Sequence, residues 1–109
     1  MTNEEFNIEI ENSTNRSKRL LMKKGLEYST VGGDRLEQFY RAGAALKTTP
    51  HTALIGMVAK HFTSLADMGK HPFDFKVEKW NEKITDIRNY TYLLDALVRD
   101  FETHREENN

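Results

Sequence analysis

Apolar residues recur every three or four positions along most of the chain, which is the spacing of amphipathic helices. The pattern predicts helices over residues 4–27, 53–68 and 76–104, and a further helix that follows Asp34 and ends before residue 47. No stretch of the sequence alternates in the manner of a strand, and no internal repeat is visible. The sequence therefore predicts an all-α fold of the four-helix bundle-like kind.

The predicted helices have start signals and inward-facing sides. Asp34 can cap the free amides of the second helix, and Glu37 three residues later completes a capping box. Pro50 disfavours helix just before it, and Thr52 can cap the third helix. The predicted inward positions of the four helices in turn are Phe6, Ile10, Ser13, Ser17, Leu20 and Leu21; Leu36, Phe39, Tyr40 and Gly43; Leu54, Val58, His61, Phe62, Leu65 and Met68; and Trp80, Ile84, Ile87, Leu94, Val98 and Phe101.

A polar strip on the fourth predicted helix stands out from this pattern. Glu82, Asp86 and Asn89 are spaced four and three residues apart, so a helix presents them on one side. At about 100° per residue, Leu93 and Leu97 continue the same strip. Because a solvated face rarely becomes rich in leucine within two turns, we expect the strip to be covered from residue 86 onward.

A covered carboxylate needs a partner, since burying an unpaired charge is costly. Mg²⁺ is one candidate partner for Glu82 and Asp86, because it prefers carboxylate oxygens and shares its coordination with phosphates and water. The alternative is that both carboxylates are solvated or pair with a basic side chain. The basic candidates are Lys83, Arg88 and Lys60.

Further candidate ligand-binding residues lie on the third helix and beside the first loop. His61 sits among apolar residues, where it is either a hydrogen-bonded core residue or a ligand-binding group. Lys60 and Asp67 share a flank of that helix, as a phosphate contact or as a surface patch. Tyr28 and Arg35 flank a loop with glycines and the start of a helix, which is a weak anion site.

Composition limits the class of protein. The 109 residues suffice for one helical domain over 1–109, with 1–10 and 103–109 as ends that fray. With 38% hydrophobic and 30% charged residues, the chain has little apolar surface to spare, and we expect a homo-oligomer in which a second copy completes the core. A net charge of −1 disfavours non-specific electrostatic binding to nucleic acid. The absence of cysteine and of long apolar runs predicts a cytoplasmic protein without signal peptide or membrane span.

Four segments in order carry a resemblance to a known family: "KKGLEYS", "DRLEQFYRAG", "MVAKHFTSLADM" and "EKITDIRNYTYLLDAL". Over residues 23–97 the chain resembles short phage-encoded helical proteins that are similar to the nucleotide modification associated domain. More remotely it is similar to the MazG-like all-α nucleotide pyrophosphohydrolases. The resemblance implies a helical, usually oligomeric scaffold that holds a nucleotide near paired helices, here in the cytoplasm of a phage-infected bacterium.

The same resemblance implies a chemistry. MazG-like enzymes hold Mg²⁺ with ExxE on one helix and ExxD on another, and split a nucleoside triphosphate into monophosphate and pyrophosphate. Glu82 and Asp86 fall where the second motif lies, with the spacing ExxxD, and Asn89 would orient a ligand or water. The third helix has no ExxE and offers Lys60 and His61 instead.

Three functions therefore stay open. The first is a Mg²⁺-dependent nucleoside triphosphate pyrophosphohydrolase. The second is a non-catalytic module that binds a nucleotide or sequesters a nucleotide signal, which the missing ExxE favours. The third is an inhibitor that binds a host protein through the polar first helix and the C-terminal tail, with no small ligand.

Overall fold

The computed structural model describes residues 1–28 and 33–107, with the side chains of residues 27 and 28 outside that description. It confirms the all-α prediction: the described residues form four α-helices and one 3-10 turn, without a strand. The elements are α1 (Asn3–Tyr28), α2 (Glu37–Ala45), α3 (Pro50–Lys70), η1 (Pro72–Asp74) and α4 (Val77–Glu107). The ends that were predicted to fray are helical over 3–10 and 103–107.

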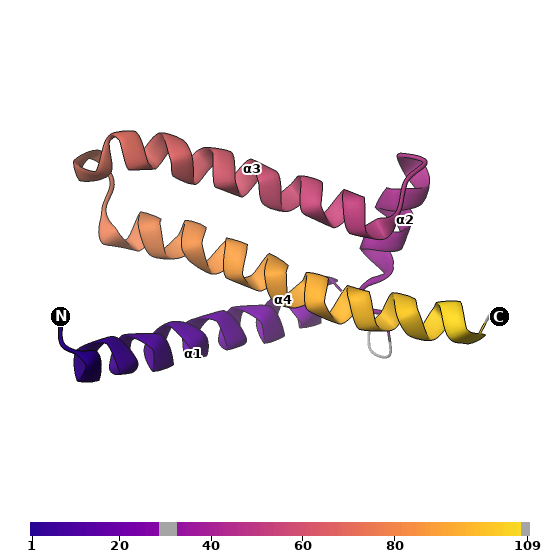
Figure 1. Cartoon of the computed structure of the whole chain (residues 1–109), viewed down its shortest axis with the longest axis horizontal. Helices are drawn as coiled ribbons and strands as arrows, with labels where there is room; N and C mark the ends of the chain where they lie inside the picture. The colour runs from indigo at the N-terminus through magenta and orange to yellow at the C-terminus, as the bar shows by residue number, and fades with distance from the viewer. Residues whose placement is uncertain (29–32, 108–109) are drawn as a thin grey trace.

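The helices are arranged around α4 rather than around a common axis (Figure 1). α3 runs antiparallel to α4, and α2 packs at the start of α3. α1 lies on the other side of α4 and, in the described part of the chain, packs against α4 alone. The molecule is elongated, at 51 × 28 × 26 Å, and its radius of gyration of 16.5 Å exceeds the about 13 Å typical of a chain this long. The fold is thus more open than the predicted bundle.

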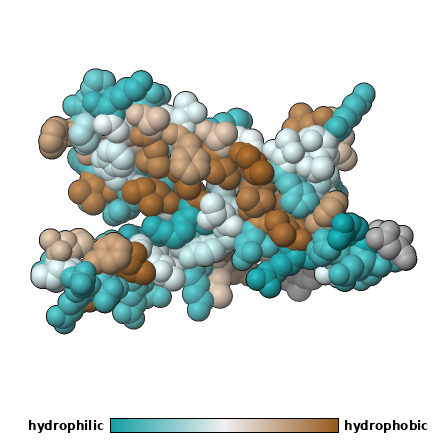
Figure 2. All heavy atoms as spheres, in the orientation of Figure 1, coloured by the Kyte–Doolittle hydropathy of each residue, from teal (hydrophilic) through white to brown (hydrophobic). Residues whose placement is uncertain are grey.

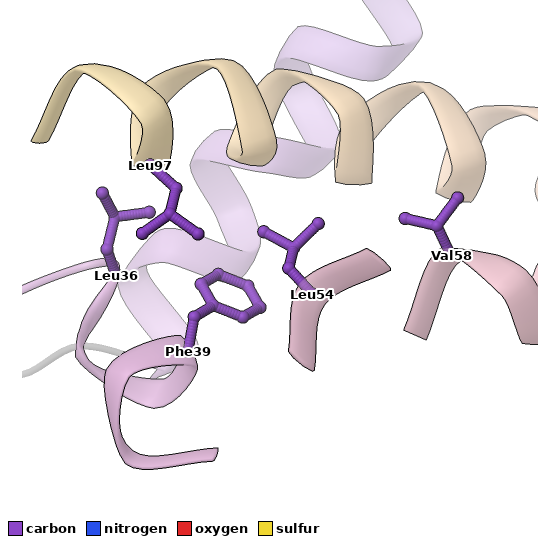
Figure 3. Close-up of a cluster of buried hydrophobic side chains, with 5 residues drawn as sticks. All are labelled: Leu36, Phe39, Leu54, Val58 and Leu97. Carbon is purple, nitrogen blue, oxygen red and sulfur yellow. The ribbon is translucent and has the colours of Figure 1, made fainter. Parts of the chain in front are cut away.

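The hydrophobic core lies where α2, α3 and α4 meet (Figure 3). The Phe39 ring of α2 points between Leu54 of α3 and Leu97 of α4, and Leu36 and Val58 close the cluster on either side. Leu54 and Leu97 are fully buried. Burying a side chain of this size contributes about 1.5–3 kcal/mol, so this small cluster carries much of the fold's apolar stabilisation.

The contact between α1 and α4 is polar. Ser13 and Ser17 are buried, as predicted for the inward side of α1, whereas Phe6 and Ile10 of the same predicted side are exposed. Arg88 of α4 donates from Nη1 to the Ser13 carbonyl oxygen at 2.9 Å and to Ser17 Oγ at 2.8 Å. The serines are small enough to let the guanidinium cross the surface of α1. We refer to Ser13, Ser17 and Arg88 as the α1–α4 polar seam.

The start of α2 differs from the predicted capping box. Asp34 does accept a backbone hydrogen bond, but from the Leu36 amide at 2.8 Å, because α2 begins only at Glu37. The Glu37 carboxylate therefore does not reach back to a cap, and it pairs with Arg41 one turn later at 2.9 Å. The box prediction was wrong because Asp34 closes a turn before the helix instead of its first turn.

The start of α3 also differs in the residue that caps it. Thr49 is the cap, with its hydroxyl accepting from the Thr52 amide at 3.1 Å, and Pro50 occupies the first helical position. Proline suits that position because its missing N–H would have no helical partner there. α2 approaches this turn closely: a Cβ on Gly43 would lie 2.8 Å from the Pro50 nitrogen, so only glycine fits.

Several predicted inward positions are exposed instead. Phe62 is 55% exposed, and Phe6, Ile10, Ile84 and Val98 are exposed as well. The buried residues of α4 are instead Thr85, Asn89 and Leu97. α1 and α3 contact α4 on two sides, so the residues between these two contacts are the ones that are covered. Figure 2 shows hydrophobic side chains gathered on one face along α3 and toward its α2 end. No helix in the described residues combines the length and apolar character needed to cross a membrane.

Candidate functional site

A cavity of about 210 Å³ opens where the end of α1, the start of α2 and the middle of α4 come together. We call it the α1–α2–α4 pocket. Its described lining residues are Leu21 and Lys24 of α1; Arg35, Gln38 and Phe39 at the start of α2; and Asp86, Asn89, Tyr90 and Leu93 of α4. Three of the residues predicted from the sequence as ligand-binding or metal-binding, Arg35, Asp86 and Asn89, are thus brought to one cavity.

Asn89 is the most unusual residue of this lining. It is only 6% exposed, and neither its Nδ2 nor its Oδ1 has a hydrogen-bond partner among the described residues. An unsatisfied buried donor or acceptor costs about 1–3 kcal/mol, so packing alone does not favour asparagine here. The burial confirms the prediction that the polar strip of α4 is covered. The Asn89 amide thus retains hydrogen-bonding capacity toward groups other than the described residues.

The charged side chains of the pocket are mixed. Lys24 and Arg35 approach from α1 and from the segment before α2, and Asp86 faces them from α4. All three are half-buried, and no ion pair joins any of them to another described residue. Partial burial strengthens Coulombic interactions relative to bulk water. Lys24 and Arg35 therefore bring two positive charges to the lining that also contains Asn89, against one negative charge from Asp86.

Aromatic rings complete the pocket. Tyr90 and Phe39 contribute to its walls, and the His61 ring lies behind Tyr90 with 5.2 Å between the ring centroids. His61 itself does not line the cavity and is half-buried. Its packing places it as a support for Tyr90, and direct phosphate contact by His61 stays a prediction.

A second, outer hollow of about 330 Å³ adjoins the pocket. It shares Arg35 and Gln38 with the pocket, and Asp34, Glu37 and Arg41 complete its described lining. Its charges balance, because two carboxylates accompany two arginines. A ligand group that extends from the pocket past Arg35 therefore encounters the Asp34 and Glu37 carboxylates as well as the Arg41 guanidinium.

The remaining predicted residues lie elsewhere. Lys60 and Asp67 are exposed on α3 and do not line the pocket, and the Tyr28 side chain falls outside the described residues. Glu82 is exposed one turn before Asp86, with Lys79 Nζ 3.8 Å from its Oε1.

The fit of these residues to Mg²⁺ is incomplete. Of the two predicted metal ligands, Asp86 alone lines the pocket. Among the described side chains, those of residues 1–26 and 33–107, no three histidine or acidic groups gather as a metal site would need. A catalytic Mg²⁺ site of the dense acidic kind is therefore not assembled by the described side chains. Mg²⁺ binding by Glu82 and Asp86 with help from a phosphate stays a prediction.

A second polar cluster joins α2 to the end of α4. The Tyr40 hydroxyl donates to Asp100 Oδ2 at 2.8 Å and lies 3.3 Å from His104 Nδ1. Burial and the Asp100 carboxylate raise the pKa of Tyr40 to about 12, because both disfavour the phenolate. The cluster lies outside the pocket lining and holds α2 in place.

Lys24 and Gln38 were not among the residues predicted from the sequence. Neither belongs to a motif, and Lys24 lies beside two other basic or small residues in "KKG". Only the crossing of α1 over α4 distinguishes Lys24 from its neighbour Lys23, which is exposed. Helical periodicity is the one feature of the sequence that could have identified Lys24. It lies two turns after Ser17 and three residues after Leu21, and therefore on the same side of α1 as both.

Comparison with known proteins yields no relative: no protein family matches the chain, and no curated protein or solved structure is significantly similar to it. The resemblance to phage-encoded and MazG-like proteins therefore stays a prediction that rests on the quoted motifs. The chemistry of the pocket is the remaining basis for proposing a function.

Proposed function

We propose that this protein binds a nucleotide in the α1–α2–α4 pocket without hydrolysing it. The observation that carries the proposal is the buried Asn89 side chain, whose amide has no hydrogen-bond partner among the described residues. In a phage-infected bacterial cytoplasm such a protein would sequester a nucleotide or a nucleotide-derived signal. The motif resemblance points to the same class of ligand.

The base-binding end of the proposal rests on Asn89. An asparagine amide offers an acceptor and two donors, and the edge of a nucleobase presents a complementary donor and acceptor side by side. The χ2 torsion of asparagine is soft, so the amide can turn its edge toward the cavity. Tyr90 supplies a half-buried aromatic ring in the same lining, and stacking of a base on such a ring contributes about 1–3 kcal/mol.

The phosphate-binding end rests on Lys24 and Arg35. A guanidinium presents several donors in a fixed plane that matches phosphate oxygens, and an ammonium adds a compact charge. Neither cation is ion-paired to another described residue, which supports their engagement by an anion.

We favour binding over hydrolysis because the described lining carries few acidic side chains. Metal-assisted cleavage of a triphosphate uses several carboxylates around the metal, and Asp86 is the one carboxylate among the described lining residues. The rival pyrophosphohydrolase needs Glu82 to join Asp86 on Mg²⁺ once a nucleotide is present. That rival is tested in the same experiment as binding.

The test is calorimetric titration of the protein with the mono-, di- and triphosphates of adenosine, guanosine, cytidine and uridine, with and without Mg²⁺. We expect saturable binding of at least one nucleotide, and weakening of about tenfold in Lys24→Gln, since one charge-assisted contact is lost. Lys23→Gln is the matched control, because Lys23 is exposed and absent from the lining. Pyrophosphate release is measured on the same samples.

Each alternative has its own result. Pyrophosphate release that is lost in a folded Asp86→Asn variant would replace the proposal with the pyrophosphohydrolase. Failure to bind any nucleotide in the panel would contradict the proposal and leave the inhibitor of a host protein as the remaining function.

A further inference from the structure

The charges around the pocket limit how many phosphates the ligand carries. Resting on the proposed nucleotide-binding function, we infer that the ligand is a nucleoside monophosphate and that di- and triphosphates bind more weakly. The inference follows from the pocket and the outer hollow considered together.

The pocket itself matches one phosphate group. Lys24 and Arg35 bring two positive charges, and Asp86 brings one negative charge, so the described lining has a single net positive charge. A phosphomonoester carries about −1.5 to −2 at neutral pH. The two cations therefore suffice for one such group, and the described lining holds no further cation for a second.

The outer hollow adds no positive charge for a longer phosphate chain. Arg35 is shared between the two cavities, so phosphates that extend beyond it enter the outer hollow. There they meet the carboxylates of Asp34 and Glu37. Arg41 is the remaining cation of the described lining, and its Nη2 already lies 2.9 Å from Glu37 Oε1. Each added phosphate is thus repelled by these two carboxylates and, beyond Arg35, finds no cation in the described lining that is free of an ion pair.

The size of the pocket agrees with this limit. Cavities that enclose a drug-sized ligand are typically about 300–1,000 Å³, and this pocket is about 210 Å³. At that volume it encloses one ring system with a neighbouring group. Further phosphates therefore find no room within the pocket and extend into the outer hollow.

The test compares AMP, ADP and ATP, and the corresponding guanosine, cytidine and uridine series, by equilibrium dialysis in the presence of EDTA. For the base that binds, we expect the monophosphate to bind about tenfold more tightly than the triphosphate, because the extra charges face two carboxylates. The unphosphorylated nucleoside should also bind about tenfold more weakly than the monophosphate, since it leaves Lys24 and Arg35 without an anion.

A double variant, Asp34→Asn with Glu37→Gln, isolates the charge argument. Asparagine keeps the oxygen that accepts from the Leu36 amide, so the turn before α2 is retained. Removing both carboxylates frees Arg41 from its ion pair. The affinity for the triphosphate should then be within about threefold of the affinity for the monophosphate. Asp95→Asn with Glu102→Gln is the matched control, since both residues are exposed on α4 and absent from both cavities.

The outcomes separate this inference from the function on which it rests. A triphosphate that binds more tightly than the monophosphate would overturn the inference and leave nucleotide binding intact. A preference for the monophosphate that the double variant does not change would overturn the role of the outer hollow. If no nucleotide or nucleoside binds, the proposed function itself fails.

Discussion

Replacing Asn89 with leucine should stabilise the ligand-free protein and weaken nucleotide binding at least about tenfold. The two side chains have the same number of heavy atoms and the same branching at Cγ, so leucine replaces the amide with little change of shape. In the wild-type protein both amide atoms are buried without a partner among the described residues. The substitution removes that penalty and, in the complex, removes the group that reads the base.

The magnitude follows from the burial of the amide. Each unsatisfied buried polar atom costs about 1–3 kcal/mol, and water that enters the pocket transiently recovers part of this. We therefore expect the free energy of unfolding to rise by about 1–3 kcal/mol. For a domain of this size each kcal/mol corresponds to roughly 4–8 °C in the melting temperature. Nucleotide affinity should fall at least about tenfold, because the base loses a charge-neutral pair of hydrogen bonds.

The assay is urea unfolding followed by circular dichroism, with calorimetric titration of the nucleotide on the same preparation. Asn12→Leu is the control, because Asn12 is exposed on α1 and its substitution should change stability by less than about 0.5 kcal/mol. An Asn89→Leu protein that is less stable than wild type would show that the amide is satisfied in solution. Unchanged nucleotide affinity would show that Asn89 does not contact the ligand.

Three further predictions concern the fold, the Tyr40 cluster and the exposed apolar surface. Gly43→Ala should lower the free energy of unfolding by about 1–3 kcal/mol, since the added Cβ would lie 2.8 Å from backbone atoms of the α2–α3 turn. Gly56→Ala is the control: its added Cβ would meet no atom within 4 Å, so the free energy of unfolding should rise by about 0.5–1 kcal/mol. Urea unfolding measures both changes. Because the pKa of Tyr40 is raised to about 12 from an ordinary value of 10, its contribution to stability should persist up to about pH 10 and be lost as the pH rises toward 12. Unfolding at several alkaline pH values should show this loss in the wild type and not in Tyr40→Phe. If a second copy covers the exposed apolar side chains of α3, sedimentation should report an oligomer that Phe62→Ser weakens, and a monomer at all concentrations would contradict the predicted self-association.

Helical periodicity predicted the secondary structure well because each helix is amphipathic over several turns. The predicted third helix, 53–68, lies within α3 (Pro50–Lys70), and the predicted fourth, 76–104, nearly coincides with α4 (Val77–Glu107). The caps were less predictable, since several polar residues near a helix start can each accept from a free amide. Thr49 rather than Thr52 caps α3 because Pro50 fits the first helical position.

The candidate site was predictable only where one helix carries it. The leucines that follow Asp86 and Asn89 showed that this strip of α4 is covered, and the structure confirms it. What covers the strip depends on how α1 and α2 cross α4, which no local pattern encodes. Lys24 therefore went unnoticed, and Lys60 on α3 was named although it is exposed and lies outside the pocket lining.

The α1–α4 polar seam fixes the register of one helix against the other. Leucine packing tolerates a slip, but Arg88 bonds one particular carbonyl and one particular hydroxyl, and a shift of one turn, about 5.4 Å, breaks both. Even a shift of one residue would rotate α1 by about 100° and turn Lys24 away from the cavity. The hydrogen bond to Ser17 therefore fixes the position of Lys24, which lies about 10 Å further along the helix axis and does not contact Ser17. Substitutions at this serine would be read out as changes in ligand affinity.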